Sequence, residues 1–286
     1  MAEKKTKPIS VPELSYLNPQ FIQSPDARAL RIAAEYLEPQ ARFRRAGIQN
    51  TVVFFGSARI LPRQAALEKL RDLEARKKGV RPAPSSAELH AAEMAVRMSR
   101  YYEEARDLAK RITQWSLSLH QSRHFLVVCS GGGPGIMEAA NRGASEAGGI
   151  SIGLNIRLPE EQAPNPYITP ELSLLFKYFF MRKLWFAQPA RALVVFPGGF
   201  GTMDELWEFL TLIQTGKFGH RAVILLYGSH YWKKAINFDW LRQSGTIDAE
   251  DLNLIRFADN TSEAFSYLKH ELRSLLNIRR LREPFM

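Results

Sequence analysis

Five short runs of mostly apolar residues, separated by longer helix-like segments, constrain this fold more than any other feature. Strands that are apolar on both faces are typical of parallel sheets, in which helices cover both sides. The alternation of such strands with helices therefore predicts an α/β fold, a Rossmann-like doubly wound parallel sheet with helices on both faces. The runs are residues 51–55, 125–129, 150–154, 192–196 and 222–227.

The segments between and beyond the runs have helical spacing. From Met94 to Trp115, apolar residues recur at alternating intervals of 4 and 3, which predicts one face of a long amphipathic helix directed at the core. We expect three parts: an N-terminal arm and helix (1–48), a Rossmann-like domain (49–260), and a C-terminal helix with a basic tail (261–286). Further helices are expected at residues 26–46, 63–78, 136–147, 171–187, 205–214 and 262–276.

Composition narrows the classes of protein to consider. The single cysteine, Cys129, excludes an intrachain disulfide and a cysteine zinc site, and its apolar surroundings favour a small core residue over a nucleophile. The formal net charge is +10, yet the basic clusters lack interleaved aromatic residues, so a solvated basic surface fits as well as an anionic partner. No apolar stretch reaches the roughly 18–20 residues of a membrane span, and the first thirty residues contain no apolar h-region. We expect a cytoplasmic protein without membrane or nucleic-acid partners.

Three of the predicted strands run into turns of small residues. These turns are Gly56-Ser57, residues 131–135 and residues 198–202. In a doubly wound sheet the carboxyl ends of the strands meet at one edge, where ligands bind. Glycine lets backbone N–H groups approach an anion, and the N-terminus of the following helix adds partial positive charge. Together the turns predict a phosphate-binding crevice.

The alternative is that these glycines only permit tight turns between strands and helices. The turn at 131–135 matches neither the Gly-x-Gly-x-x-Gly dinucleotide motif nor a Walker A loop. The turn at 198–202 is the stronger signal, because three glycines and a threonine lie within five positions.

Two roles fit Glu205. Thr202 and Glu205 have the spacing of a capping box, in which Glu205 would only cap its own helix. Alternatively, its carboxylate projects into the crevice beside the phosphate, where it would stabilise a sugar cation or orient water.

Arg182 and Lys183 also admit two interpretations. They belong to a strongly apolar segment, so both cations need partners if it is buried. Successive helical positions are about 100° apart, so the two side chains must face different surroundings, one of them the site. Otherwise both extend along the surface with their charges in water.

These residues resemble the Lonely Guy family of nucleotide phosphoribohydrolases. The resemblance is carried by the Met181-Arg182-Lys183 string and by the run Pro-Gly-Gly-Phe-Gly-Thr-Met-Asp-Glu that begins at Pro197. The Gly56-Ser57-Ala58-Arg59 turn and the run from Gly133 to Asn141 match in order, and the latter, with Asn165-Pro166-Tyr167, resembles the longer bacterial branch. The resemblance covers roughly residues 50–260.

The resemblance implies hydrolysis of a nucleoside 5′-monophosphate, of the AMP or cytokinin riboside type, to a free base and ribose 5-phosphate. Arg182 and Glu205 would be the catalytic pair, no metal or cofactor would be needed, and the protein would form a homodimer or larger homo-oligomer. Members are often labelled lysine decarboxylases, but this chain has no clear pyridoxal-phosphate lysine motif. Substrate-binding roles are expected for Gly56, Ser57, Arg59, Gly132, Gly133, Met181, Lys183, Gly198, Gly199, Phe200, Gly201 and Thr202.

Two other functions remain open on the sequence. A non-catalytic nucleotide-binding or cofactor-carrying protein needs only the glycine turns, whereas the presence of both Arg182 and Glu205 favours an enzyme. A nucleic-acid binder rests on net charge alone.

Overall fold

The computed structural model describes residues 13–77, 83–119, 125–159 and 163–277, and these form a seven-stranded parallel sheet. Its strands are β1 (Asn50–Phe55), β2 (Leu126–Ser130), β3 (Ser151–Ile156), β4 (Ser173–Phe176), β5 (Ala190–Val195), β6 (Val223–Tyr227) and β7 (Ile255–Ala258). Their order across the sheet is β4-β3-β2-β1-β5-β6-β7. The direction of winding reverses between β1 and β5, which confirms the predicted doubly wound α/β fold.

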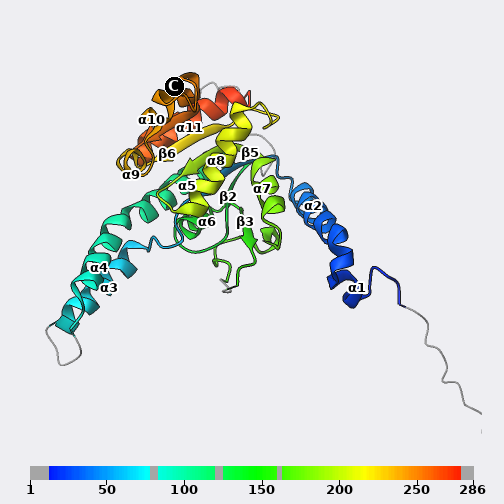
Figure 1. Cartoon of the computed structure of the whole chain (residues 1–286), viewed down its shortest axis with the longest axis horizontal. Coiled ribbons are helices and arrows are strands. Elements are labelled where there is room, and N and C mark those ends of the chain that lie inside the picture. The colour runs from blue at the N-terminus through cyan, green and yellow to red at the C-terminus, as the bar shows by residue number, and fades with distance from the viewer. Residues whose placement is uncertain (1–12, 78–82, 120–124, 160–162, 278–286) are drawn as a thin grey trace, which may run out of the picture.

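Helices pack against both faces of this sheet (Figure 1). The α-helices are α1 (Pro19–Gln23), α2 (Arg28–Arg45), α3 (Arg63–Lys77), α4 (Ser86–Met98), α5 (Arg100–Ser118), α6 (Ile136–Glu146), α7 (Phe179–Ala187), α8 (Phe200–Gln214), α9 (Ser229–Ala235), α10 (Phe238–Gln243) and α11 (Thr261–Leu275). Short 3-10 turns lie at η1 (Pro25–Ala27), η2 (Pro170–Leu172) and η3 (Glu250–Leu254).

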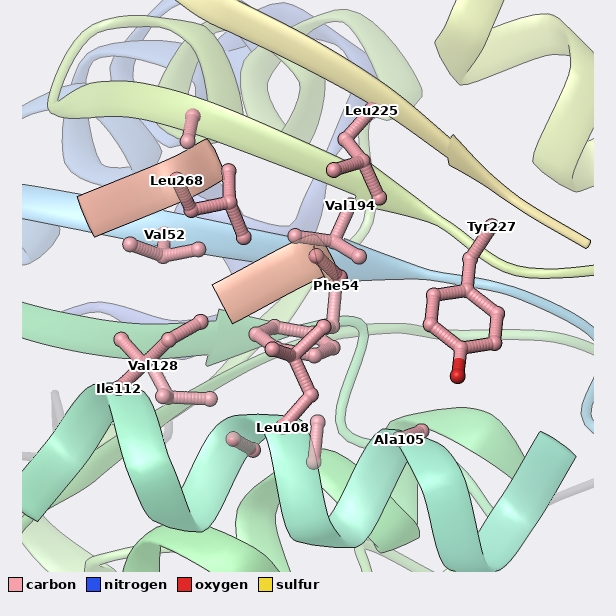
Figure 2. Packing of buried hydrophobic residues seen from close by; sticks show 14 of the residues in the cluster. Val52, Phe54, Ala105, Leu108, Ile112, Val128, Val194, Leu225, Tyr227 and Leu268 are labelled. Carbon is pink, nitrogen blue, oxygen red and sulfur yellow. The ribbon is translucent and has the colours of Figure 1, made fainter. Parts of the chain in front are cut away.

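The alternation of side chains along each strand divides the core into two layers. Val52 and Phe54 of β1 point to one face, where they pack against α5, α6 and α11, as Figure 2 shows for α5 and for Leu268 of α11. Val53 and Phe55 point to the other face, toward α2, α7, α8 and α9. All four side chains are buried, so both faces of β1 are excluded from water.

Cys129 lies in β2 and is 1% exposed. Burial raises the pKa of its thiol well above the ordinary value, so the side chain remains a neutral thiol. The prediction of a small core residue is confirmed.

The helix predicted at residues 171–187 is wrong in its first half. Residues Ser173–Phe176 form the edge strand β4, which pairs with β3, and α7 begins only at Phe179. Leu174 and Phe176 are buried while Leu175 is 66% exposed, which is the alternation of a strand. The apolar run fits both a helix and a strand locally, and pairing with β3 decides between them.

The single helix predicted through Met94 to Trp115 is also corrected. Ser99 separates α4 from α5, and its hydroxyl donates a hydrogen bond to the carbonyl of Val96. α5 carries the expected buried stripe, whereas Met94 on α4 is 37% exposed. α4 instead packs along α3, and the two project together from the body of the protein (Figure 1).

Strand β7 and helices α9 and α10 were not predicted, because each is short and weakly periodic. Helix α11 follows the expected boundary at residue 260, and its Leu268 and Leu272 belong to the same core layer as β1 and α5. The three-part division of the chain stays a prediction.

Candidate functional site

The three glycine turns follow three neighbouring strands. β2, β1 and β5 are adjacent in the sheet, and the turns leave their carboxyl ends at the point where the strand order reverses. This is the position at which ligands bind in doubly wound sheets. The sheet therefore brings together the segments that the sequence marked as a crevice.

Main-chain hydrogen bonds connect the three turns. The N–H of Ser57 donates to the carbonyl of Pro197 over 3.0 Å, and the carbonyl of Ser57 accepts from the N–H of Ile136 at 3.1 Å. Gly135 has φ of 70°, and a Cβ at this position would lie 2.4 Å from the carbonyl oxygen of Ser57. Only glycine satisfies both conditions, so this glycine has a structural role in joining the turns.

Two asparagines hold the second turn. The side-chain amide of Asn165 donates to the carbonyls of Gly132 and Gly133, each over 3.1 Å, and to Oδ1 of Asn141 at 2.9 Å. Ser130 at the end of β2 donates to the same Asn141 oxygen. Asn165 and Asn141 belong to the segments that carried the family resemblance, but the sequence alone assigned them no role.

The third turn is the N-terminus of α8. The helix begins at Phe200 with Gly199 as its N-cap, and no side chain caps it. The N–H groups of Gly199, Phe200 and Gly201 donate no hydrogen bond to any residue that the structure describes. By contrast, Asn18, Ser85, Asn237 and Asn260 cap the helices that follow them. The open N–H groups of α8 suit an anion.

The capping box proposed for Thr202 and Glu205 is wrong. Thr202 lies within the first turn of α8 rather than at its N-cap, so Glu205 is not positioned to bond the cap residue. Thr202 instead packs against Gly198, where a Cβ would lie 2.1 Å from the threonine hydroxyl oxygen. The Thr-x-x-Glu spacing suggested a cap at Thr202, which would require α8 to begin at Met203, whereas it begins at Phe200.

Glu205 is a buried carboxylate without a partner. Its residue is 5% exposed, and Oε2 has no hydrogen bond to any described residue. Burial raises the pKa of Glu205 to about 7, while Arg182 and Lys183 act in the opposite direction. A carboxyl group with such a pKa, at the carboxyl edge of a doubly wound sheet, is a candidate functional residue.

Arg182 on α7 is the other largely buried charge in this region. Its Nε donates to the carbonyl of Leu154 at 2.8 Å, and its guanidinium lies 5.1 Å from the ring centre of Phe186. Burial lowers the pKa of Arg182, and the charge of Glu205 acts against this shift. A Cβ at Gly131 would lie 2.6 Å from Nη2 of Arg182, so the second turn leaves space for the guanidinium.

No ion pair joins Arg182 to any carboxylate that the structure describes. Arg182 and Glu205 thus influence each other's pKa without direct contact. Such a pair can act on a ligand that lies between them.

Lys183 faces a different environment, as expected for the next position on the helix. Its Nζ forms ion pairs with Asp204 at 2.8 Å and with Glu208 at 2.7 Å, both on α8. Although partial burial lowers the pKa of Lys183, these two carboxylates raise it overall. Its side chain therefore connects α7 to α8.

The N-terminal helix α2 fixes the start of α7. The Glu35 carboxylate accepts hydrogen bonds from the N–H groups of Lys177 and Tyr178, at 2.8 and 3.2 Å, just before α7. The indole of Trp185 donates to the Glu35 carbonyl at 3.0 Å. A carboxylate at a helix N-terminus is stabilising, so α2 helps to position the helix that carries Arg182. Sequence reasoning missed Glu35, because nothing local connects it to α7.

The remaining predicted site residues lie around these turns. Gly56 packs against Ile136, with no room for a Cβ, and Arg59 is exposed at the end of the first turn. Met181 is buried, whereas Phe200 is 93% exposed at the tip of the third turn.

Among the described residues, no helix is long and apolar enough to cross a membrane. Within the same ranges, no three His, Cys, Asp or Glu side chains gather closely enough to hold a metal ion.

Three comparisons relate the chain to known proteins. Residues 137–268, which include Arg182 and Glu205, match the model of a family described as "Possible lysine decarboxylase". A probable cytokinin riboside 5′-monophosphate phosphoribohydrolase of Oryza sativa subsp. japonica is 29% identical over 167 residues, which cover 57% of this chain and 67% of the relative. A second rice protein with the same description is 27% identical over 177 residues, which cover 59% of this chain and 76% of the relative. The solved structure of the molybdenum cofactor carrier protein of Chlamydomonas reinhardtii matches 78% of this chain and 98% of its own, with 18% identity and a TM-score of 0.46.

Proposed function

Since the chain belongs to the Lonely Guy family of nucleotide phosphoribohydrolases, we propose that it hydrolyses the N-glycosidic bond of a nucleoside 5′-monophosphate. The products are a free base and ribose 5-phosphate. AMP and cytokinin riboside monophosphates are the first substrates to consider, because the two rice relatives are described as acting on the latter.

The observation that carries this proposal is the position of Glu205 relative to the open end of α8. Gly201 and Glu205 are four positions apart on one helix, so they share a face and are separated by about 6 Å along the axis. A phosphate on the free N–H groups of α8 would direct the attached ribose toward Glu205. A 5′-phosphorylated nucleoside has this arrangement of charge and sugar.

The proposed mechanism follows from the charges that develop as the bond breaks. The ribose ring becomes positive and the departing base becomes negative; the oxygen of a water molecule then bonds to the ring cation, and the proton that the water loses passes to the base. The Glu205 carboxylate stabilises the positive ring, and no internal hydrogen bond must be broken first because Oε2 is unpartnered. Arg182, held at Nε by Leu154, has its remaining N–H groups available to orient Glu205 and the substrate.

Substrate contacts are proposed for the turns and for the start of α7. The turn at 198–202 would hold the phosphate, while residues 179–181 and the 56–59 turn would border the base. Gly132 and Gly133 complete the proposed surroundings, and Lys183 contributes indirectly, through its ion pairs with Asp204 and Glu208 on α8. We further propose that the protein is cytoplasmic and acts as a homodimer or larger homo-oligomer.

The experiment is a chromatographic screen of nucleoside monophosphates, in which the released base and ribose 5-phosphate are quantified together. We expect equimolar release of both products from at least one nucleotide. Thermal stabilisation by nucleotides without any product would contradict the enzyme and support a nucleotide-binding or cofactor-carrying protein. Neither product nor stabilisation across the screen would reject both functions.

A further inference from the structure

Two consecutive aromatic residues on α9 donate hydrogen bonds to the main chain around the third turn. The hydroxyl of Tyr231 donates to the carbonyl of Gly198 at 2.8 Å. The indole N–H of Trp232 is shared between the carbonyls of Val195 and Tyr227, each at 3.1 Å. Helix α9 therefore holds the ends of β5 and β6 and one peptide of the phosphate turn.

The start of α9 is itself fixed. Asp259, just after β7, accepts hydrogen bonds from both the N–H and the hydroxyl of Ser229, at 2.7 and 2.6 Å. Trp232 is completely buried. Tyr231 is thus presented to Gly198 from a rigid support.

The hydrogen bond to Gly198 determines where the next N–H points. The carbonyl of Gly198 and the N–H of Gly199 belong to one trans peptide, in which the two groups point in opposite directions. Because Tyr231 holds the carbonyl on its own side, the N–H of Gly199 points away from α9. That N–H has no acceptor among the described residues, and the space beside Gly199 is open.

This peptide needs an external restraint. It is flanked by two glycines, which lack the Cβ atoms that restrict backbone rotation in other residues. A rotated peptide would present a carbonyl oxygen to an anion in place of an N–H donor, and attraction would become repulsion.

We propose that Tyr231 is a positioning residue for phosphate recognition, acting through the Gly198–Gly199 peptide. The inference rests on the proposed function for the identity of the ligand, a 5′-phosphorylated nucleoside. It assigns Tyr231 no contact with the reacting atoms. Removing its hydroxyl weakens the binding of the phosphate and leaves the binding of the base and ribose unchanged.

The test compares Tyr231→Phe with Tyr102→Phe. The control loses a tyrosine hydroxyl that also makes a hydrogen bond, to Glu138 at 2.6 Å between α5 and α6. Affinities for AMP, adenosine and inorganic phosphate are measured by calorimetry for both variants and the wild type. The amide resonance of Gly199 is followed by NMR during the phosphate titration.

In Tyr231→Phe we expect AMP and phosphate to bind about fivefold to tenfold more weakly, which is the range for loss of one neutral hydrogen bond. Adenosine affinity should change less than about twofold, and the phosphate-induced shift of the Gly199 amide should shrink. In turnover, KM for the monophosphate should rise while kcat is nearly retained.

Equal phosphate affinity in Tyr231→Phe and the wild type overturns the inference, as does an equal loss for AMP and adenosine, since that indicates general damage. A wild type that binds phosphate and AMP without hydrolysis overturns only the proposed reaction. A wild type that binds neither overturns both.

Discussion

Helices α7 and α8 bring charges together in two regions that behave in opposite ways. In the outer region, Lys183 pairs with Asp204 and Glu208 at normal ion-pair distances, and all three side chains are partly exposed. In the inner region, Arg182 and Glu205 are largely buried and form no ion pair with each other. Lys183 follows Arg182 directly on α7, and on α8 Asp204 and Glu208 lie one and three positions from Glu205.

This difference separates a structural use of charge from a functional one. The outer charges satisfy one another and need nothing else. The inner carboxylate has an orphaned oxygen and a raised pKa, which costs free energy in the folded state. A ligand that pairs with this carboxylate would remove that free-energy cost. If the two regions differ in this way, substitutions in the inner region should affect activity far more than substitutions in the outer region.

The largest effect is expected for Glu205→Ala, measured against Glu208→Ala on the next turn of α8. Loss of the inner carboxylate should lower kcat by about a thousandfold, because it removes the charge that stabilises the sugar cation. The outer variant should retain activity at pH 8 within about threefold. Circular dichroism serves as the control for folding. Equal activities in the two variants would remove the functional distinction between the regions.

Arg182→Lys should have the next largest effect, a fall in kcat/KM of about a hundredfold. Lysine keeps the charge but lacks the fixed planar fork of the guanidinium, in which Nε bonds the Leu154 carbonyl while the two Nη groups keep a set direction toward a ligand. The measurement is steady-state hydrolysis at saturating and limiting nucleotide. Near-normal activity would show that charge alone suffices and that the anchored geometry is unimportant.

The raised pKa of Glu205 predicts a pH dependence of stability. Between the unfolded value of about 4.5 and the folded value of about 7, the folded protein holds a proton that the unfolded chain has lost. The free energy of unfolding should therefore decrease as pH rises through this interval, by about 1 to 3 kcal/mol, and then level off. Denaturant unfolding of the wild type and Glu205→Gln at pH 5 and pH 8 measures this, since glutamine cannot ionise. A constant difference between the two proteins would contradict the raised pKa.

The same ionisation should appear in catalysis, because the carboxylate is the active form. Activity should fall as pH drops below about 7.

The smallest effects are expected in the outer region, where they should have opposite signs. Lys183→Met removes a charge that lowers the pKa of Glu205, so the midpoint of the activity profile should move up by less than about one pH unit. Asp204→Asn removes a charge that raises this pKa, so the midpoint should move down. Stability should change by no more than about 1 kcal/mol in either variant, as for other partly exposed ion pairs. Shifts in the same direction would mean that the two regions are not electrostatically coupled.

Much of the sheet was predictable, because buried parallel strands are visible as apolar runs. The turn at 198–202 was found for a related reason, since closely spaced glycines after such a run have few other uses. The start of α7 was not predictable. Residues Ser173–Phe176 become a strand only because β3 lies beside them, and no local preference records that pairing.

The site was predictable where its residues are close in the chain and not where distant elements meet. Arg182 and Glu205 were identified through a motif, but the support given by Glu35 and Tyr231 depends on how elements far apart in sequence pack. Glu35 precedes Lys177, whose N–H donates to its carboxylate, by 142 positions. The capping-box interpretation failed for a local reason, because Gly199 and Phe200 start α8 earlier than an apolar pattern indicates.

The pairing of β1 has a consequence for how the protein acquires its site. Asn50 pairs with Leu126 in β2, and Thr51 lies opposite Ala190 in β5. Each pairing closes a long loop, and the chain entropy lost in closing the loop is offset only once the strands have paired. For this reason parallel sheets fold slowly. The bonds that Ser57 makes to Pro197 and Ile136 can form only after both loops have closed. The three turns are therefore joined only when both pairings are in place, and no fragment that ends before β5 contains the whole site.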